Sequence, residues 1–225
     1  IIKLVTMANS PLDGVRVLNL VKSVKVPTIG FCMGEFGMFS RVLCCKFGAK
    51  FTYAAVSRER EVAPGQLTFD ELAKLYRFND IGADTPVYAV LGDPISHSLS
   101  PLLHNRELAA RKLSGTYVPI RVPADRFEEC VKGLQSVGIR GFSVTIPHKE
   151  AAAKMYPATD PLVDRVQASN TLYRDGSTWK AANTDYQAAM ESLQAVLAPG
   201  ESLSGKRCII LGAGGVARAI AYGLI

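Results

Sequence analysis

Four short polar motifs, each at the end of an apolar run, carry the side chains that could do chemistry. They supply hydroxyls, carboxamides, one lysine and one aspartate, and they occupy residues 96–101, 143–149, 169–171 and 183–185. Hydroxyls and carboxamides bond ring alcohols, and a cation can face a carboxylate, so this set suits a small polyhydroxylated acid. Lys149 and Asp185 could form the ion pair or proton relay that deprotonates an alcohol during hydride transfer.

Each of these residues also has a structural explanation, which is the stronger one when the residues are taken singly. Ser98 or Ser100, just before Pro101, could cap a helix. Lys149 could be a solvated lysine in the first turn of a helix, and Asp185 could be a turn residue. The residues alone therefore leave both explanations open.

A glycine-rich turn near the end of the chain is typical of dinucleotide binding. The apolar run 207–211 leads into G-x-G-x-x-A at residues 212–217. In such a turn, glycines allow a pyrophosphate to approach the backbone, and the following helix offers amide donors. The predicted cofactor-binding residues are Gly212, Ala213, Gly214, Gly215, Val216 and Ala217. A plain β–α turn remains the alternative. The residue that separates NAD from NADP is expected about 20 positions further on, whereas the chain ends 13 residues after Gly212.

Residues 1–78 alternate between β-rich runs and amphipathic stretches. The predicted strands are 1–6, 28–32 and 51–56, and the predicted helices are 12–21, 37–47 and 69–78. Three successive βα units indicate a parallel sheet or part of a barrel, although three units alone cannot close an eight-stranded barrel. Residues 79–86, which are polar with glycine and proline, are the predicted linker.

A second α/β pattern follows the linker. The predicted strands are 87–91, 115–121 and 141–145, and the predicted helices are 101–110, 127–137 and 149–155. A hairpin is predicted over 170–174 and 180–183, around Asp175-Gly176. It is followed by a linking helix over 188–196, then by the strand 207–211 and a last helix.

Composition indicates a globular protein and excludes several functions. The chain is 48% hydrophobic and 20% charged, and its net charge of +6 comes from scattered basic residues, so nucleic-acid binding is not expected. No apolar run approaches the about 18 residues that cross a bilayer. Five cysteines without a C-x-x-C pair predict buried thiols in a reducing compartment, with no disulfide and no metal. Because the chain begins in a predicted strand and ends in a predicted helix, we expect both ends to be truncations.

The motifs from residue 92 onward are similar to those of shikimate dehydrogenase. They are G-x-P-x-x-H-S-x-S-P (92–101), V-T-x-P-x-K (144–149), S-N-T (169–171), N-T-D (183–185) and L-G-A-G-G (211–215), in that family's order and spacing. The resemblance implies that NADP is the cofactor and that Lys149 and Asp185 are the catalytic pair. It further implies a set of substrate-binding residues, namely Ser98, Ser100, Thr145, Asn170 and Asp185. Ser143 stands where bacterial enzymes often have asparagine, as in plant bifunctional enzymes, and His148 is not expected to be catalytic.

The first 80 residues resemble the C-terminal part of type I 3-dehydroquinate dehydratase. The matching motifs are the strand around Lys3, M-G-x-x-G-x-x-S-R (33–41), F-G (47–48) and A-P-G-Q (63–66). By itself, Lys3 fits an exposed edge strand. The resemblance instead implies that Lys3 forms an imine with the substrate, that Arg41 holds the substrate carboxylate, and that Gln66 belongs to a loop closing over the site.

Three departures from the dehydratase pattern concern the first segment. Tyr53 stands where the family usually has phenylalanine, and Val62 stands where a serine commonly contacts the substrate. The family's acid–base histidine lies upstream of the imine-forming lysine, whereas this chain has no histidine before His97. As it stands, the dehydratase half is therefore expected to be incomplete.

Together the two resemblances predict an α/β chain with three parts. These are the C-terminal part of a (β/α)8 barrel over 1–80, a shikimate-binding α/β domain over 87–190, and the start of a Rossmann domain over 191–225. This order matches plant-type bifunctional enzymes and the end of the fungal pentafunctional shikimate-pathway protein. The implied small-molecule partners are 3-dehydroquinate, 3-dehydroshikimate and shikimate, in the cytoplasm or, in a plant, the plastid. Two alternatives remain, a quinate dehydrogenase and a non-catalytic quinate-pathway repressor built from the same domains.

Overall fold

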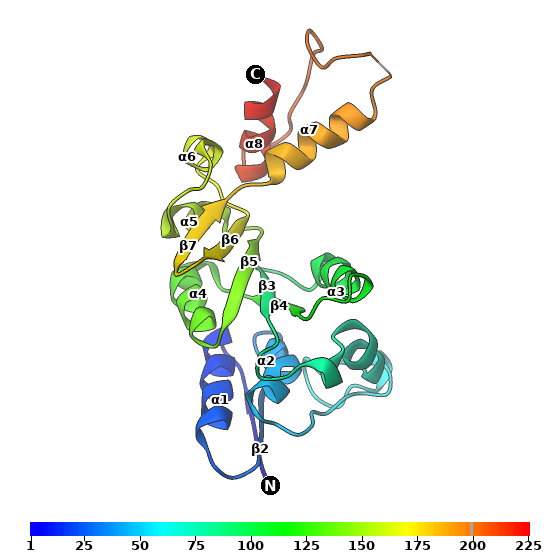
Figure 1. The fold of residues 1–225 in the computed structure, drawn as a ribbon, viewed down its shortest axis with the longest axis vertical. Helices are drawn as coiled ribbons and strands as arrows, with labels where there is room; N and C mark the ends of the chain where they lie inside the picture. The colour runs from blue at the N-terminus through cyan, green and yellow to red at the C-terminus, as the bar shows by residue number, and fades with distance from the viewer. Residues whose placement is uncertain (199) are drawn as a thin grey trace. The chain divides into compact units, whose positions relative to one another are not determined.

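The computed structural model describes residues 1–198 and 200–225, and it divides into two compact units, Ile1–Phe142 and Ser143–Ile225 (Figure 1). Both units combine helices and strands, as the α/β prediction requires. The described strands form a two-stranded sheet, β1-β2, and a five-stranded sheet with the order β4-β3-β5-β6-β7. Strand β5 (Ile139–Val144) runs across the division between the units.

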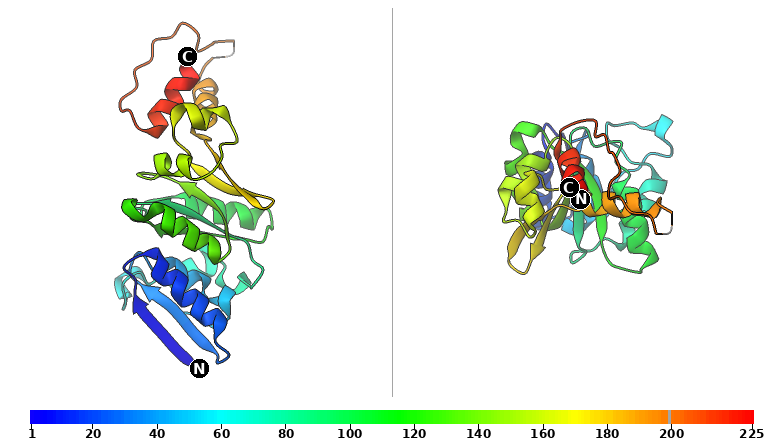
Figure 2. Two further views of the ribbon diagram at one scale, coloured as in Figure 1. Left: turned by 90° about the vertical axis from the view of Figure 1, so that its left-hand side faces the viewer. Right: turned by 90° about the horizontal axis from the view of Figure 1, so that it is seen from above.

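The first unit begins with a βαβ unit. Strand β1 (Ile2–Met7) pairs in parallel with β2 (Thr28–Met33), and helix α1 (Pro11–Ser23), which connects them, packs on β2 (Figure 2). The backbone amide of Ser10 donates to Asp13 Oδ2 at 3.1 Å, which satisfies a donor at the helix start. Gly30 is required for the close helix–strand approach, because a Cβ there would lie 2.4 Å from Val21 Cγ2.

The next predicted elements form only in part. The helix predicted over 37–47 is split into α2 (Met38–Leu43) and a 3₁₀ turn, Cys44–Phe47, which ends at Gly48 with φ +106°. The helix predicted over 69–78 forms over 69–75, and its larger part, Glu71–Leu75, is π-helical. The strand predicted over 51–56 is absent, and only an isolated bridge between Ala55 and Thr68 occurs there.

The missing strand has a physical cause. A strand is stabilised by a ladder of hydrogen bonds to a neighbouring strand, and apolar β-rich sequence does not supply that neighbour. Among the described residues of this segment, the only sheet is the parallel pair β1-β2. Within the described residues of this segment the structure forms one pair of parallel strands, so the assignment to part of a (β/α)8 barrel stays a prediction.

The rest of the first unit follows the predicted order. Strands β3 (Val87–Gly92) and β4 (Thr116–Arg121) pair in parallel, and α3 (Ser100–Ala110) connects them. Helix α4 (Phe127–Ser136) then leads to β5. Its Gly133 faces Leu12 of α1 so closely that a Cβ on Gly133 would lie 2.4 Å from Leu12 Cδ2. The two predicted segments of the chain therefore pack against each other inside this unit.

The second unit holds the predicted hairpin and four helices. Strands β6 (Thr171–Asp175) and β7 (Thr178–Ala182) are antiparallel and are joined through Gly176, whose φ is +59°. The loop is thus Gly176-Ser177, one position later than the predicted turn, because Asp175 pairs with Thr178. The helices are α5 (Lys149–Met155), α6 (Pro161–Val166), α7 (Asp185–Ala195) and α8 (Gly215–Leu224).

The strand predicted over 207–211 does not form. These residues have no assigned secondary structure, and Ile209 and Leu211 are 90% and 93% exposed. An apolar strand at the start of a dinucleotide-binding domain is normally held between neighbouring parallel strands. No other strand of the described chain pairs with these residues. The glycine turn and α8 form without it.

No helix among the described residues is long and apolar enough to cross a bilayer.

The cysteines give a direct test of this fold. Cys32, Cys44 and Cys130 are buried, whereas Cys208 is exposed. Burial raises the pKa of the Cys44 thiol to about 12 and that of Cys130 to about 11. Because the thiolate is the reactive form, we expect an alkylating reagent at about pH 8 to label Cys208 quickly and these three thiols only on unfolding. Peptide mass spectrometry over time measures this, and equally fast labelling of Cys44 would contradict the packing.

Candidate functional site

Lys149 and Asp185 form an ion pair in the second unit. Lys149 is the first residue of α5 and Asp185 the first of α7, and Lys149 Nζ donates to Asp185 Oδ2 at 2.6 Å. Their side chains are only 16% and 18% exposed. A partly desolvated pair of this kind can pass a proton to or from a bound alcohol. The structure thus brings together the two residues that the sequence nominated for this role.

Asn170 holds the aspartate from a second side. Its Nδ2 donates to Asp185 Oδ1 at 3.0 Å and to Thr184 Oγ1 at 2.9 Å. Its Oδ1 accepts from the Thr184 amide at 3.1 Å and from Thr171 Oγ1 at 2.8 Å. Because both ends of the carboxamide are used, its orientation is fixed, and the aspartate keeps one oxygen for Lys149.

Asn183 supports the site without having been predicted as a site residue. Its Oδ1 accepts from the Asp185 amide at 2.9 Å, and its Nδ2 donates to the carbonyl of Ala168 at 2.9 Å. The side chain is buried. The spacing of two residues in N-T-D is that of an Asx turn, so the sequence did contain the signal for this contact.

The glycine turn lies beside the lysine. Gly212 has φ +110°, and α8 begins at Gly215. A Cβ on Gly215 would lie 2.8 Å from Ala168 Cβ and 3.6 Å from Lys149 Cβ, so a side chain there would push α8 away from the lysine. A cavity of about 650 Å³ is lined on one side by Thr145 and Lys149, and on the other by Gly212 and residues 214–217. The predicted cofactor residue Ala213 is not among the lining residues.

A further ion pair joins the helix after this turn to α5, and no sequence motif indicated it. Arg218 Nη2 in α8 donates to Glu150 Oε1 in α5 at 2.6 Å. Glu150 follows Lys149 and also lines the cavity. The helix that carries the glycine turn is therefore tied to the helix that carries the lysine.

The predicted substrate serines belong to the first unit. Ser100 begins α3 and Pro101 follows it, while Ser98 Oγ accepts from the Ser100 amide at 3.3 Å. This contact forms a turn just before the helix, whose N-cap is Leu99 without a side-chain hydrogen bond, so neither serine takes the capping role that the sequence left open. Ser98 also lines a cavity of about 400 Å³, together with Ser96 and with Gly65 of the A-P-G-Q loop. His148, in the second unit, is buried, and its amide donates to Thr145 O at 2.9 Å.

Lys3 and Arg41 each contact an aromatic ring, and the two rings lie next to each other. Lys3 lies on the exposed strand β1, with Nζ 4.2 Å from the ring centroid of Tyr53. The Tyr53 ring lies 6.1 Å from that of Phe31, which in turn lies 4.4 Å from the guanidinium carbon of Arg41. Gln66 is buried, and its Oε1 accepts from the amide of Val62 at 3.0 Å.

Arg41 is a charged side chain that is almost completely buried. It is 2% exposed, and its Nε and Nη2 have no hydrogen-bond partner. Burial lowers the pKa of its guanidinium from the ordinary value. A buried, charged donor group without partners is costly, and such a group is suited to a carboxylate or another anionic acceptor.

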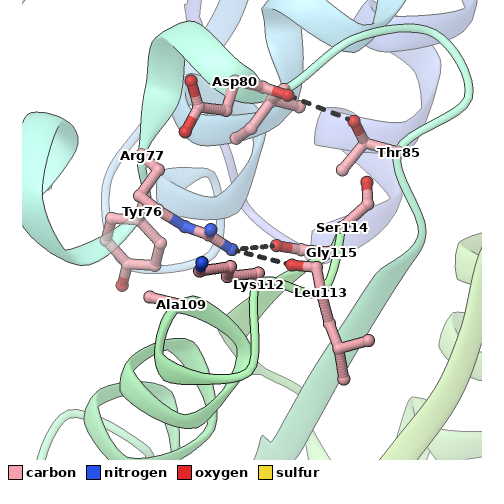
Figure 3. A pocket seen from close by; sticks show the side chains of 10 residues that line it. Tyr76, Arg77, Asp80, Thr85, Ala109, Lys112, Leu113, Ser114 and Gly115 are labelled. Carbon is pink, nitrogen blue, oxygen red and sulfur yellow. Dashed lines mark hydrogen bonds between the residues drawn. The ribbon is translucent and has the colours of Figure 1, made fainter.

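A separate cavity of about 400 Å³ lies where residues 76–85 meet the end of α3 (Figure 3). Arg77, whose φ is +49°, points its guanidinium toward that helix end. Its Nη2 donates to the carbonyls of Gly115 at 3.2 Å and Leu113 at 3.4 Å. In the predicted linker itself, the carbonyls of Ala83 and Thr85 accept from Lys46 Nζ, the latter at 2.9 Å, so the linker is held against the first segment. No cluster of metal-ligating side chains occurs in the described ranges 1–198 and 200–225.

Two stretches of the chain match known families. Residues 1–83 match type I 3-dehydroquinase, and residues 90–172 match the shikimate dehydrogenase substrate-binding domain. The chain joins these two domain types. The shikimate dehydrogenase match contains Lys149 and Asn170, whereas Asp185 and the glycine turn lie beyond it.

One similar protein is named for both activities, and another for shikimate dehydrogenase alone. The bifunctional 3-dehydroquinate dehydratase/shikimate dehydrogenase of Arabidopsis thaliana is 37% identical, over 99% of this chain and 39% of the relative. The shikimate dehydrogenase (NADP(+)) of Syntrophobacter fumaroxidans is 41% identical, over 62% of this chain and 47% of the relative. The chain therefore spans about half the length, or less, of these relatives.

Solved structures of shikimate 5-dehydrogenases are similar to part of this chain. The shikimate 5-dehydrogenase of Thermus thermophilus, in complex with NADP(H) and shikimate, has a TM-score of 0.56 and 34% identity, covering 62% of this chain and 52% of that chain. The enzyme of Listeria monocytogenes, in complex with shikimate and NAD, has a TM-score of 0.56 and 31% identity, covering 62% of this chain and 47% of that chain.

Proposed function

We propose that this chain serves the NADP-dependent interconversion of 3-dehydroshikimate and shikimate, joined to the dehydration of 3-dehydroquinate. The observation that carries the first activity is the Lys149–Asp185 pair at 2.6 Å, oriented by Asn170 beside the glycine turn. In the oxidising direction this pair accepts the proton of the shikimate alcohol, and in the reducing direction it returns the proton. Thr145 offers its hydroxyl to a ring alcohol, whereas Asn170, whose carboxamide is fully engaged, binds one by exchanging its contact with Thr184 or Thr171.

The proposed cofactor fits the residues present. NADP+, when bound, supplies the hydride acceptor. The backbone of the glycine turn is accessible to a ligand, because no atom lies within 4 Å of the position that a Cβ would take at Gly212 or Gly214. The start of α8 offers amide donors to a phosphate. Relatives named for NADP(+) support this cofactor over NAD, although the Listeria complex contains NAD.

For the first segment we propose the dehydratase roles that its motifs imply. Lys3 forms the imine, and Arg41 binds the substrate carboxylate. The buried guanidinium with two unpaired nitrogens supports the second role. The proposed domains are a barrel part over 1–80, a shikimate-binding domain over 87–190 and the start of a Rossmann domain over 191–225. A plastid location is supported by the name of the Arabidopsis relative, which includes "chloroplastic".

Calorimetric titration of the chain with shikimate tests the proposal, because binding needs only the substrate groups. Thr145→Val is expected to weaken binding about tenfold, since it leaves a substrate hydroxyl unpaired. Thr178→Val is the matched control, because Thr178 lies in the hairpin and its hydroxyl donates only to Asp175 O. A chain that binds quinate but not shikimate would overturn the substrate assignment. Tight shikimate binding without any NADP+ reduction would favour a metabolite sensor.

A further inference from the structure

Arg121 connects the two family segments. It is the last residue of β4, and its Nε donates to Asp93 Oδ1 at 2.7 Å. Its Nη1 donates to Glu35 Oε2, also at 2.7 Å, and its guanidinium carbon lies 5.0 Å from the ring centroid of Phe36. Asp93 belongs to the shikimate dehydrogenase segment, whereas Glu35 and Phe36 belong to the 3-dehydroquinase segment. One planar guanidinium therefore holds a carboxylate from each.

On one side, the contact anchors the loop that carries the predicted shikimate serines. The loop leaves β3 at Gly92, whose carbonyl accepts from the amide of Val122 at 3.1 Å. Asp93 follows, and the loop then closes on itself where the amide of Ser98 donates to the carbonyl of Ile95 at 3.1 Å. The Asp93–Arg121 bond is thus the side-chain anchor at the base of the loop that presents Ser98.

On the other side, the contact reaches the loop with the A-P-G-Q motif. Gly34, next to Glu35, donates its amide to the carbonyl of Pro64 at 2.9 Å. Gly65 packs directly on Gly34, because a Cβ on Gly65 would lie 2.7 Å from Gly34 O. The A-P-G-Q loop is therefore hydrogen-bonded to, and packed on, the residue next to Glu35.

These contacts form one continuous series. It runs from Pro64 through Gly34 and Glu35 to Arg121, and from there through Asp93 to the serine loop. The cavity of about 400 Å³ near this series is lined from both segments, by Glu35 and Gly65 on one side and by Ser98 on the other. Packed and hydrogen-bonded series of this kind can carry energetic coupling between sites, provided that the coupling is measured.

We propose that Arg121 is a positioning residue that couples the A-P-G-Q loop of the first segment to the serine loop of the second. The importance of these loops for substrate rests on the proposed function, whereas the coupling itself rests on the contacts. Arg121 can satisfy both carboxylates only in one orientation, so losing either carboxylate frees the guanidinium to shift toward the other. Coupling is reciprocal, so a change in either loop alters the other.

Amide hydrogen exchange of the ligand-free chain tests the coupling directly. Glu35→Gln, on the first segment, is expected to raise exchange at the Ser98 amide about threefold, because one partly exposed ion pair is lost. Asp93→Asn, on the second segment, is expected to raise exchange at the Gly34 amide to a similar extent. The matched control is Arg126→Gln, which removes an exposed arginine bonded to Glu129 within one helical turn. Glu35→Gln with unchanged exchange at Ser98 would overturn the proposal.

A double-mutant cycle with shikimate supplies the functional measurement. Arg121→Gln is expected to weaken shikimate binding about tenfold, because two ion pairs and a cation–π contact are lost. Glu35→Gln is expected to weaken it about threefold alone and to add nothing in the Arg121→Gln background. Additive effects would show that Glu35 does not act through Arg121 and would overturn the coupling. A wild-type chain that binds no shikimate would instead overturn the proposed function, and hydrogen exchange would still decide the coupling.

Discussion

Replacing Lys149 by methionine is expected to lower shikimate-dependent reduction of NADP+ by a factor of about 10²–10⁴, because a positioned acid–base group contributes about that much. The ammonium of Lys149 has one partner, Asp185 Oδ2 at 2.6 Å, and the pair is mostly shielded from solvent. Methionine keeps the length of the side chain and removes the proton-carrying group. Absorbance of NADPH over time measures the effect.

The variant should remain folded and should still bind shikimate, because the other contacts of Asp185 remain. Its Oδ1 still accepts from Asn170 Nδ2, and its amide still donates to Asn183 Oδ1. The matched control is Lys154→Met, which changes an exposed lysine of the same helix. Asp185→Asn should reproduce the loss, since an amide cannot accept the proton. Near-normal turnover by Lys149→Met would remove the catalytic assignment.

Most of the polar site could be predicted from sequence because its residues follow strand ends in short, ordered motifs. Lys149, Asn170 and Asp185 lie in three separate motifs, and the structure joins them through direct hydrogen bonds. The glycine turn was predicted from its own spacing, and α8 does begin at Gly215. These motifs are local in sequence, and it was the resemblance of their order to shikimate dehydrogenase that favoured the functional explanation over the structural one.

The features that the sequence did not indicate depend on partners far along the chain. Glu150 pairs with Arg218 and Glu35 with Arg121, and neither pair has a local pattern. The strands predicted over 51–56 and 207–211 do not form, because strand formation also depends on a partner far along the chain. Apolar alternation predicts that a segment can pair, whereas only tertiary structure determines whether a neighbouring strand is present.

Replacing Arg41 by methionine is expected to stabilise the ligand-free chain while abolishing recognition of a carboxylate substrate by the first segment. Arg41 is buried, and its Nε and Nη2 lack hydrogen-bond partners. Each unsatisfied buried donor costs about 1–3 kcal/mol. Methionine removes both donors, and in return it loses the contact with the Phe31 ring, worth about 0.5–2 kcal/mol. Two donors at about 1–3 kcal/mol each, less the ring contact at about 0.5–2 kcal/mol, leave an expected net gain in free energy of unfolding of up to about 5 kcal/mol.

Thermal unfolding followed by circular dichroism measures this change, with an expected rise of the midpoint by about 2–4 °C for each kcal/mol gained. The matched control is Arg58→Met, because Arg58 is largely exposed and paired with Glu61 and Glu71, so its removal should leave the midpoint unchanged or lower it. Addition of 3-dehydroquinate should raise the midpoint of the wild-type chain and not that of Arg41→Met, since ligand that binds only the folded state stabilises it. A lower midpoint for Arg41→Met without ligand would show that the guanidinium is satisfied in solution. Stabilisation by removal of a buried charge, together with loss of the ligand effect, is the behaviour of a residue kept for binding at a cost in stability.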